Sequence, residues 1–137
     1  MKQIKVLHVL TSDRYSGAEN VACQIIHGFE QEPSYQLVYC SPDGPIRKAL
    51  EEQQVPFAAM QKWSLPELKR VIREQKPDII HAHDMKASLF SALVCGSIPM
   101  VSHIHNNSYD SQKVTVKAVL YRYAARKAKH IFWVSHA

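Results

Sequence analysis

The sequence is short of glycine, cysteine and long apolar runs, and each shortage excludes a class of protein. Only four of the 137 residues are glycine, and no G-x-G-x-x-G or Walker A loop occurs, which argues against an NAD, FAD or P-loop site. The three cysteines are an odd number without metal-site spacing, so they predict buried free thiols in a reducing cytoplasm. No run of about 18 apolar residues occurs, so no membrane-spanning helix is expected.

Acidic residues are missing from the end of the chain. Residues 111–137 contain six lysines and arginines and no acid, whereas residues 1–110 contain 11 basic and 12 acidic residues. The whole excess of positive charge therefore lies in the last 27 residues of the chain. This asymmetry indicates either an anionic partner or a solvated helix face, and both interpretations remain open.

The sequence does contain a regular alternation of strand-like and helix-like segments. The strand candidates are mostly continuous apolar runs, which are typical of strands buried on both faces of a parallel sheet. They are Ile4–Leu10, Tyr35–Ser41, Phe57–Gln61, Asp78–His83, Met100–His105 and His130–Ser135. The helix candidates are Ala18–Glu30, Pro45–Gln53, Ser64–Gln75, Met85–Cys95 and Ser111–Lys129. This order predicts one α/β domain, a doubly wound, mainly parallel sheet with helices on both faces.

Histidines gather where these strands end. Ligands of doubly wound sheets bind beyond the carboxyl ends of the strands, and five of the eight histidines lie there: His81, His83, His103, His105 and His136. Two H-x-H pairs place their imidazoles on one side of a strand, as zinc ligands require. One hypothesis is therefore a metal-dependent hydrolase that uses His81, His83, His103 and His105. The other is that these histidines have backbone partners inside the sheet.

The turn "YSGAEN" after the first strand has two interpretations as well. Backbone N–H groups at a helix N-terminus bind anions, and a glycine such as Gly17 lets the anion approach closely. Ser16 and Glu19 also match a capping box, S-x-x-E, which needs no ligand. The local sequence alone favours the capping box.

Five segments, taken in order, carry a resemblance to a known family. "IKVLHVLTSDRYSGAENVACQII" resembles the first strand and the G-G-x-E turn of family 4 glycosyltransferases of the GT-B fold. "SPDGPIRKALEEQQVPF" resembles the glycine-led second helix, and "KPDIIHAHDMKASLFSAL" resembles the P-D-[IV]-[IV]-H-x-H strand with its helix. "IPMVSHIHNN" and "AKHIFWVSHA" resemble the P-V-V-x-T-x-H stretch and the strand ending in V-S.

The resemblance implies a retaining enzyme that moves a sugar from a nucleotide-sugar donor to a glycan or lipid-linked acceptor. Residues 1–137 would be its Rossmann-like N-terminal, acceptor-side domain, with the donor-binding C-terminal domain absent from this chain. No metal and no other cofactor is implied, because the nucleotide-sugar is a substrate, and no nucleic acid is an expected partner. A non-enzymatic sugar- or nucleotide-binding module of the same fold remains an alternative.

The resemblance also implies roles for particular residues. Ser16 and Gly17 match the turn that lies against the donor diphosphate, and His105 matches a histidine that positions the transferred sugar. The acceptor-side cleft would be lined by Arg14, Glu19, His83, Asp84 and Asn106. The basic segment Lys113–Lys129 would meet an anionic membrane surface. The expected location is cytoplasmic, with peripheral attachment at the inner face of the cell membrane as an extension of that hypothesis.

Overall fold

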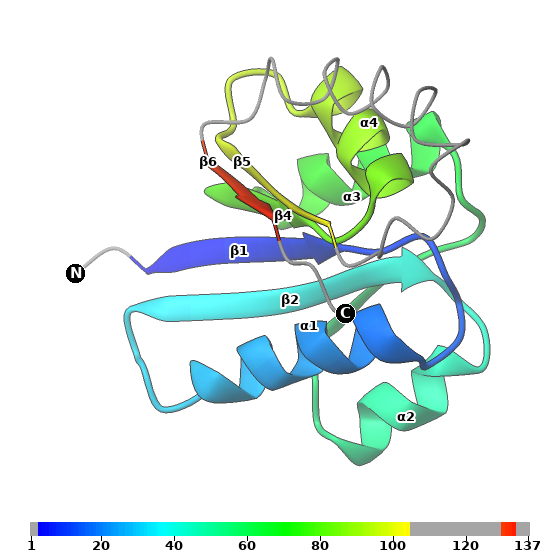
Figure 1. Cartoon of the computed structure of the whole chain (residues 1–137), viewed down its shortest axis with the longest axis vertical. Coiled ribbons are helices and arrows are strands. Elements are labelled where there is room, and N and C mark those ends of the chain that lie inside the picture. The colour runs from blue at the N-terminus through cyan, green and yellow to red at the C-terminus, as the bar shows by residue number, and fades with distance from the viewer. Residues whose placement is uncertain (1–2, 105–129, 134–137) are drawn as a thin grey trace.

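The computed structural model describes residues 3–104 and 130–133, and its strands form one parallel sheet (Figure 1). The strands are β1 (Ile4–Val9), β2 (Tyr35–Pro42), β3 (Phe57–Met60), β4 (Ile79–Ala82), β5 (Met100–Ile104) and β6 (His130–Trp133). Their order across the sheet is β3-β2-β1-β4-β5-β6. The predicted doubly wound α/β fold is confirmed, and each described strand lies within or close to its predicted range.

Helices cover both faces of the sheet. They are α1 (Gly17–Gly28), α2 (Ile46–Glu52), α3 (Leu65–Gln75) and α4 (Met85–Val94). In Figure 1, α1 and α2 lie on one side of the sheet and α3 and α4 lie on the other. The predicted helix Ser111–Lys129 lies outside the described residues, and so does the basic segment Lys113–Lys129.

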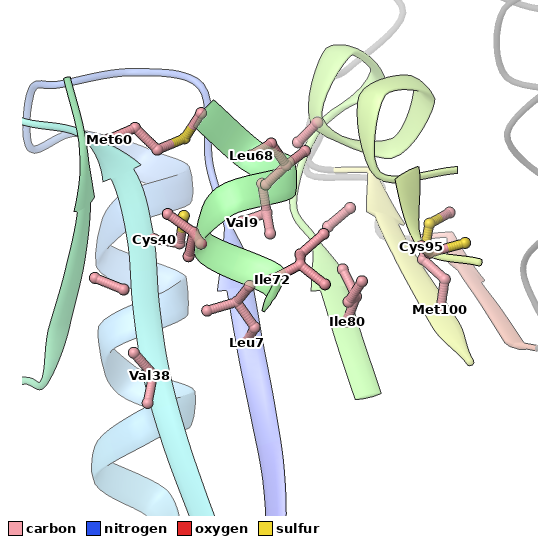
Figure 2. Packing of buried hydrophobic residues seen from close by; sticks show 14 of the residues in the cluster. Leu7, Val9, Val38, Cys40, Met60, Leu68, Ile72, Ile80, Cys95 and Met100 are labelled. Atoms are coloured by element: carbon pink, nitrogen blue, oxygen red, sulfur yellow. The ribbon is translucent and has the colours of Figure 1, made fainter. Parts of the chain in front are cut away.

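Two apolar clusters hold these layers together, because neighbouring residues of a strand face opposite sides of the sheet. Leu7 and Val9 of β1 belong to the cluster under α3 and α4, whereas Val6 and Leu10 belong to the cluster under α1 and α2. Figure 2 shows the first cluster, in which side chains of α3 meet those of β1. Because of this alternation, His8 lies on the same face of the sheet as Val6 and Leu10, which is the face covered by α1 and α2.

The three cysteines are free thiols, and all three are buried. Burial raises the pKa of Cys23 to about 11 and the pKa of Cys40 to about 12. A thiol with such a pKa carries little thiolate at neutral pH, and the thiolate is the reactive form. The prediction of buried free thiols is confirmed, and these side chains serve packing.

Ser64 and Glu67 have the same S-x-x-E spacing as Ser16 and Glu19, which predicts a second capping box at the start of α3, but this box is only half formed. The Ser64 side chain accepts a hydrogen bond from the Glu67 backbone N–H at 3.3 Å. The Glu67 carboxylate, however, accepts from the backbone N–H of Gln61 at 2.7 Å and from Arg70 at 2.8 Å. Glu67 therefore ties α3 to the end of β3 instead of reaching back to Ser64.

This arrangement predicts a specific acid sensitivity. The hydrogen bond from Arg70, followed by that from the Gln61 N–H, lowers the pKa of Glu67 from 4.5 to about 2. A carboxyl whose folded-state pKa is depressed adds stability above its unfolded pKa and loses it as the pH falls through the folded value. We expect Glu67 to make the free energy of unfolding fall as the pH drops from about 4.5 to about 2. In Glu67→Gln the free energy of unfolding should fall less over this pH range.

Urea unfolding of the parent and of Glu67→Gln, measured at pH 7, 4.5 and 2.5, checks this. Glu52→Gln is the matched control, because Glu52 is an exposed glutamate at the end of α2. If the free energy of unfolding fell equally with pH in the parent and in Glu67→Gln, Glu67 would have no such role.

Candidate functional site

The sheet has a topological switch point between β1 and β4. β1 pairs with β2 on one side and with β4 on the other. The chain leaves β1 toward α1 on one face and leaves β4 toward α4 on the opposite face. The two loops therefore leave toward opposite faces at the carboxyl ends of these strands, and doubly wound proteins bind ligands at such a switch point. The candidate site is built from the turn that follows β1 and the residues that follow β4.

Asp84 joins the two loops at this switch point. It is the N-cap of α4, where one carboxylate oxygen accepts the Ala87 backbone N–H at 2.7 Å. The other oxygen accepts the hydroxyl of Thr11, which follows β1, at 2.9 Å. Both side chains are half-buried. Asp84 is thus held by both loops and lies at the switch point, and its acceptor-side role stays a prediction.

The β1–α1 turn contains the capping box that the local sequence favours. The Ser16 backbone N–H donates to Glu19 Oε1 at 2.9 Å, and the Ser16 hydroxyl donates to the same oxygen. Glu19 is only 4% exposed. Its carboxylate therefore supports the turn from inside, which fixes how the first turn of α1 presents its backbone.

Gly17 has no structural reason to be glycine. Its φ lies outside the left-handed region, and a Cβ built at this exposed position would meet nothing within 4 Å. Gly44 is the opposite case, because a Cβ there would lie 2.7 Å from Asp13 Oδ2. Asp13 lies in the β1–α1 loop and Gly44 lies in the β2–α2 loop. The Ile46 N–H also joins these two loops, because it donates to the Asp13 carbonyl at 2.7 Å. Gly44 serves the packing of two loops, whereas Gly17 leaves open space at the N-terminus of a helix.

His83 lies beneath this surface and not on it. Its side chain has no exposed area, and its Nε2 is 2.8 Å from Nδ1 of the equally buried His8. The rings of His81 and His83 stack at 4.2 Å. In the described structure His83 therefore supports the start of the β4–α4 loop and has no surface to offer a ligand.

Other predicted site residues are only partly placed. Arg14 is exposed on the β1–α1 turn, where its backbone N–H donates to Ser12 Oγ at 3.1 Å. His103 is in β5, but its side chain is not described, and His105 and Asn106 lie outside the described residues. The described site thus has two parts, a β1–α1 side with Arg14, Ser16, Gly17 and Glu19 and a β4–α4 side with Asp84, beneath which the buried His83 lies.

Solved structures with the same fold define the class. The Anabaena protein HepE, crystallised with UDP and glucose, has a TM-score of 0.76 and 22% identity, over 94% of this chain and 37% of that one. MurG of Acinetobacter baumannii has a TM-score of 0.65 and 12% identity, over 96% and 41%. A Neisseria meningitidis UDP-GlcNAc 2-epimerase, bound to UDP-GlcNAc, has a TM-score of 0.62 and 15% identity, over 95% and 40%. The likeness shows a Rossmann-like domain of the GT-B kind.

The family follows from the sequence comparison. The model of Glycosyltransferase Family 4 matches residues 15–137, so the chain belongs to that family. A curated relative is the Escherichia coli UDP-Gal:alpha-D-GlcNAc-diphosphoundecaprenol alpha-1,3-galactosyltransferase, which is 24% identical over 88% of this chain and 35% of that protein. The predicted resemblance is confirmed, and the chain spans little more than a third of the length of this relative. Within the described residues no helix is long and apolar enough to cross a bilayer.

Proposed function

We propose that the chain is the acceptor-side part of an enzyme that transfers a sugar from a nucleotide-sugar donor to a glycan or lipid-linked acceptor with retention of configuration. The observation that carries the proposal is Gly17, an exposed glycine at the N-terminus of α1 that the fold does not require. Beside the switch point, a missing side chain lets an anionic group approach the helix end.

The physical chemistry of the turn supports a diphosphate as that group. The first N–H groups of an α-helix have no acceptor within the helix, and the helix dipole favours negative charge there. Departure of a nucleoside diphosphate leaves negative charge on its oxygens, which fixed N–H donors stabilise. Ser16 and Gly17 are the proposed contact, and the buried Glu19 holds the turn in place.

The names of similar proteins agree with this substrate class. HepE was crystallised with UDP and glucose, and the Escherichia coli relative is named for transfer of galactose from UDP-Gal to a GlcNAc on diphosphoundecaprenol. For this chain we propose a nucleotide-sugar as donor and Asp84 and Arg14 as acceptor-side residues. His105 as the sugar-positioning residue, Asn106 in the cleft and the membrane contact of Lys113–Lys129 remain predictions.

The test is a transfer assay on the complete protein that carries this chain. It is incubated with a panel of radiolabelled nucleotide-sugars and with free and diphospholipid-linked saccharides as acceptors. We expect one donor to give a labelled product, whose anomeric configuration by NMR equals that of the donor sugar. Inversion would refute the retaining mechanism. Tight binding of a nucleotide-sugar with no transfer to any acceptor would favour the non-enzymatic binding module.

A further inference from the structure

An exposed aromatic ring lies beside the candidate site. Among the described residues, four large apolar or aromatic side chains are exposed, and they are Tyr15, Phe29, Tyr35 and Leu93. Phe29 and Tyr35 pack against each other between the end of α1 and the start of β2, with ring centroids 5.1 Å apart, and Leu93 lies near the end of α4. Tyr15 belongs to the loop between β1 and α1, which lies at the end of the sheet to which the β1 and β2 arrows point (Figure 1). Of these four side chains, Tyr15 is therefore the one next to the Ser16–Gly17 turn.

The hydroxyl of Tyr15 holds this ring in place. It donates a hydrogen bond to Asn20 Oδ1 at 2.8 Å. Tyr15 is the residue before the N-cap Ser16, and Asn20 is in the first turns of α1. Apolar side chains at these two positions of a helix often pack against each other and fix how the chain enters the helix. Here a hydrogen bond makes that connection, because asparagine offers an amide oxygen in place of an apolar surface.

The polar connection leaves much of the ring uncovered. Tyr15 is 40% exposed, and Asn20 is exposed as well. An apolar side chain at position 20 would instead pack against the ring and cover part of it. A tyrosine side chain has only two torsions, so a ring with a fixed hydroxyl has little freedom left to lose when a ligand binds. Tyr15 is thus a preorganised aromatic surface that faces solvent.

The chemistry of the ring selects the kind of ligand. The faces of an aromatic ring carry partial negative charge, so they repel a phosphate and attract the slightly positive C–H groups on the apolar face of a sugar ring. In the chain, Tyr15 stands between the Ser16–Gly17 turn, proposed for the donor diphosphate, and the exposed Arg14, proposed for the acceptor side. A sugar ring of the acceptor is the ligand that fits both this chemistry and this position.

We propose that Tyr15 stacks against a pyranose ring of the acceptor and that Asn20 positions the tyrosine through its hydroxyl. This inference rests on the proposed function, because it takes the Ser16–Gly17 turn as the donor diphosphate contact. It also narrows the acceptor class: the acceptor presents a saccharide unit to the β1–α1 loop, whether that saccharide is free or lipid-linked. Tyr15 contributes binding and orientation, and it takes no part in bond making or breaking.

The test is steady-state kinetics of the complete protein with the donor and the acceptor identified in the transfer assay. Tyr15→Ala is expected to raise the acceptor KM about 5- to 10-fold, the loss of one stacking contact. The donor KM and kcat are expected to change less than about two-fold, because a contact made equally in the ground and transition states affects KM alone. Tyr15→Leu is a second variant in case the alanine variant does not fold, and it should raise the acceptor KM as well.

Two milder variants test the role of the hydrogen bond. Tyr15→Phe keeps the ring and loses the bond to Asn20, and Asn20→Ala keeps the ring and removes its partner. Each is expected to raise the acceptor KM about two- to three-fold, because the ring remains but is less well positioned. Tyr35→Ala is the matched control, since Tyr35 is 37% exposed at the start of β2, and it should leave both KM values unchanged.

The possible results separate this inference from the proposed function. An unchanged acceptor KM in a folded Tyr15→Ala variant, with only a lower melting temperature, would mean that Tyr15 serves the entry into α1 and would overturn the inference. A rise in the donor KM in place of the acceptor KM would point to stacking of the nucleotide or the donor sugar and would overturn it too, as would an equal rise in Tyr35→Ala. Absence of transfer by the parent protein would refute the proposed function itself, and this inference with it.

Discussion

Replacing Gly17 by valine is expected to lower the transfer rate of the complete protein by about 100- to 1,000-fold, the loss typical of removing fixed donors to a developing anion. The branched side chain would fill the open space beside the N-terminus of α1 and keep the diphosphate away from its backbone N–H groups. The fold has no such conflict, because a Cβ at this position meets nothing within 4 Å. We therefore expect catalysis to fail in a protein that is still fully folded.

Two glycine-to-alanine variants sharpen this experiment. Gly17→Ala places one methyl group in open space, so it should reduce transfer less than valine and leave stability equal or slightly higher, because alanine favours helix. Gly44→Ala should behave in the opposite way, because its Cβ would lie 2.7 Å from Asp13 Oδ2 and force the two loops apart. Transfer rates, melting temperatures and donor binding are measured for all three. Wild-type transfer by Gly17→Val would refute the diphosphate contact.

Replacing Asp84 by alanine is expected to lower the free energy of unfolding by about 2 kcal/mol. The loss of an N-cap costs about 1 kcal/mol, and the loss of a hydrogen bond to a charged acceptor costs about 1 kcal/mol or more. Both losses apply because Asp84 accepts from the Ala87 N–H and from the Thr11 hydroxyl at the same time. Urea unfolding of the 137-residue chain at pH 7 measures the change.

Two further variants separate the contributions of Asp84. Asp84→Asn keeps a good N-cap oxygen and should retain most of the stability. Thr11→Val removes only the hydrogen bond between the two loops, so it should cost less than Asp84→Ala. In the double variant the Thr11→Val cost should disappear, because its partner is gone. A change below about 0.5 kcal/mol for Asp84→Ala would show that neither hydrogen bond contributes.

The elements of this fold could be predicted well from the sequence because their signals are local. The apolar runs at Ile4–Leu10 and Tyr35–Ser41 became β1 and β2 with nearly the same bounds. The pattern S-x-x-E predicted a capping box between Ser16 and Glu19, and the structure has this capping box at the start of α1. The same pattern at Ser64 predicted the cap but not the second partner of Glu67, since Gln61 and Arg70 approach it only in the packed structure.

The candidate site was less predictable, because its contacts join residues that are far apart in the chain. Asp84 was identified through the family resemblance, but its partner Thr11 is 73 positions away and had no signal of its own. His8 was missed altogether, since a single histidine in "IKVLHVL" looks like part of a buried strand. Only the register of β1 against β4 brings it opposite His81.

The sequence by itself determined the order of strands and helices, the caps of α1 and α3, and membership of the glycosyltransferase family, because these depend on neighbouring residues and on ordered motifs. The tertiary structure alone decided that Gly17 stands in open space while Gly44 is enclosed. It also decided that His83 is buried against His8, a residue 75 positions away. Strand pairing sets these environments, and no local pattern contains the register of a parallel sheet.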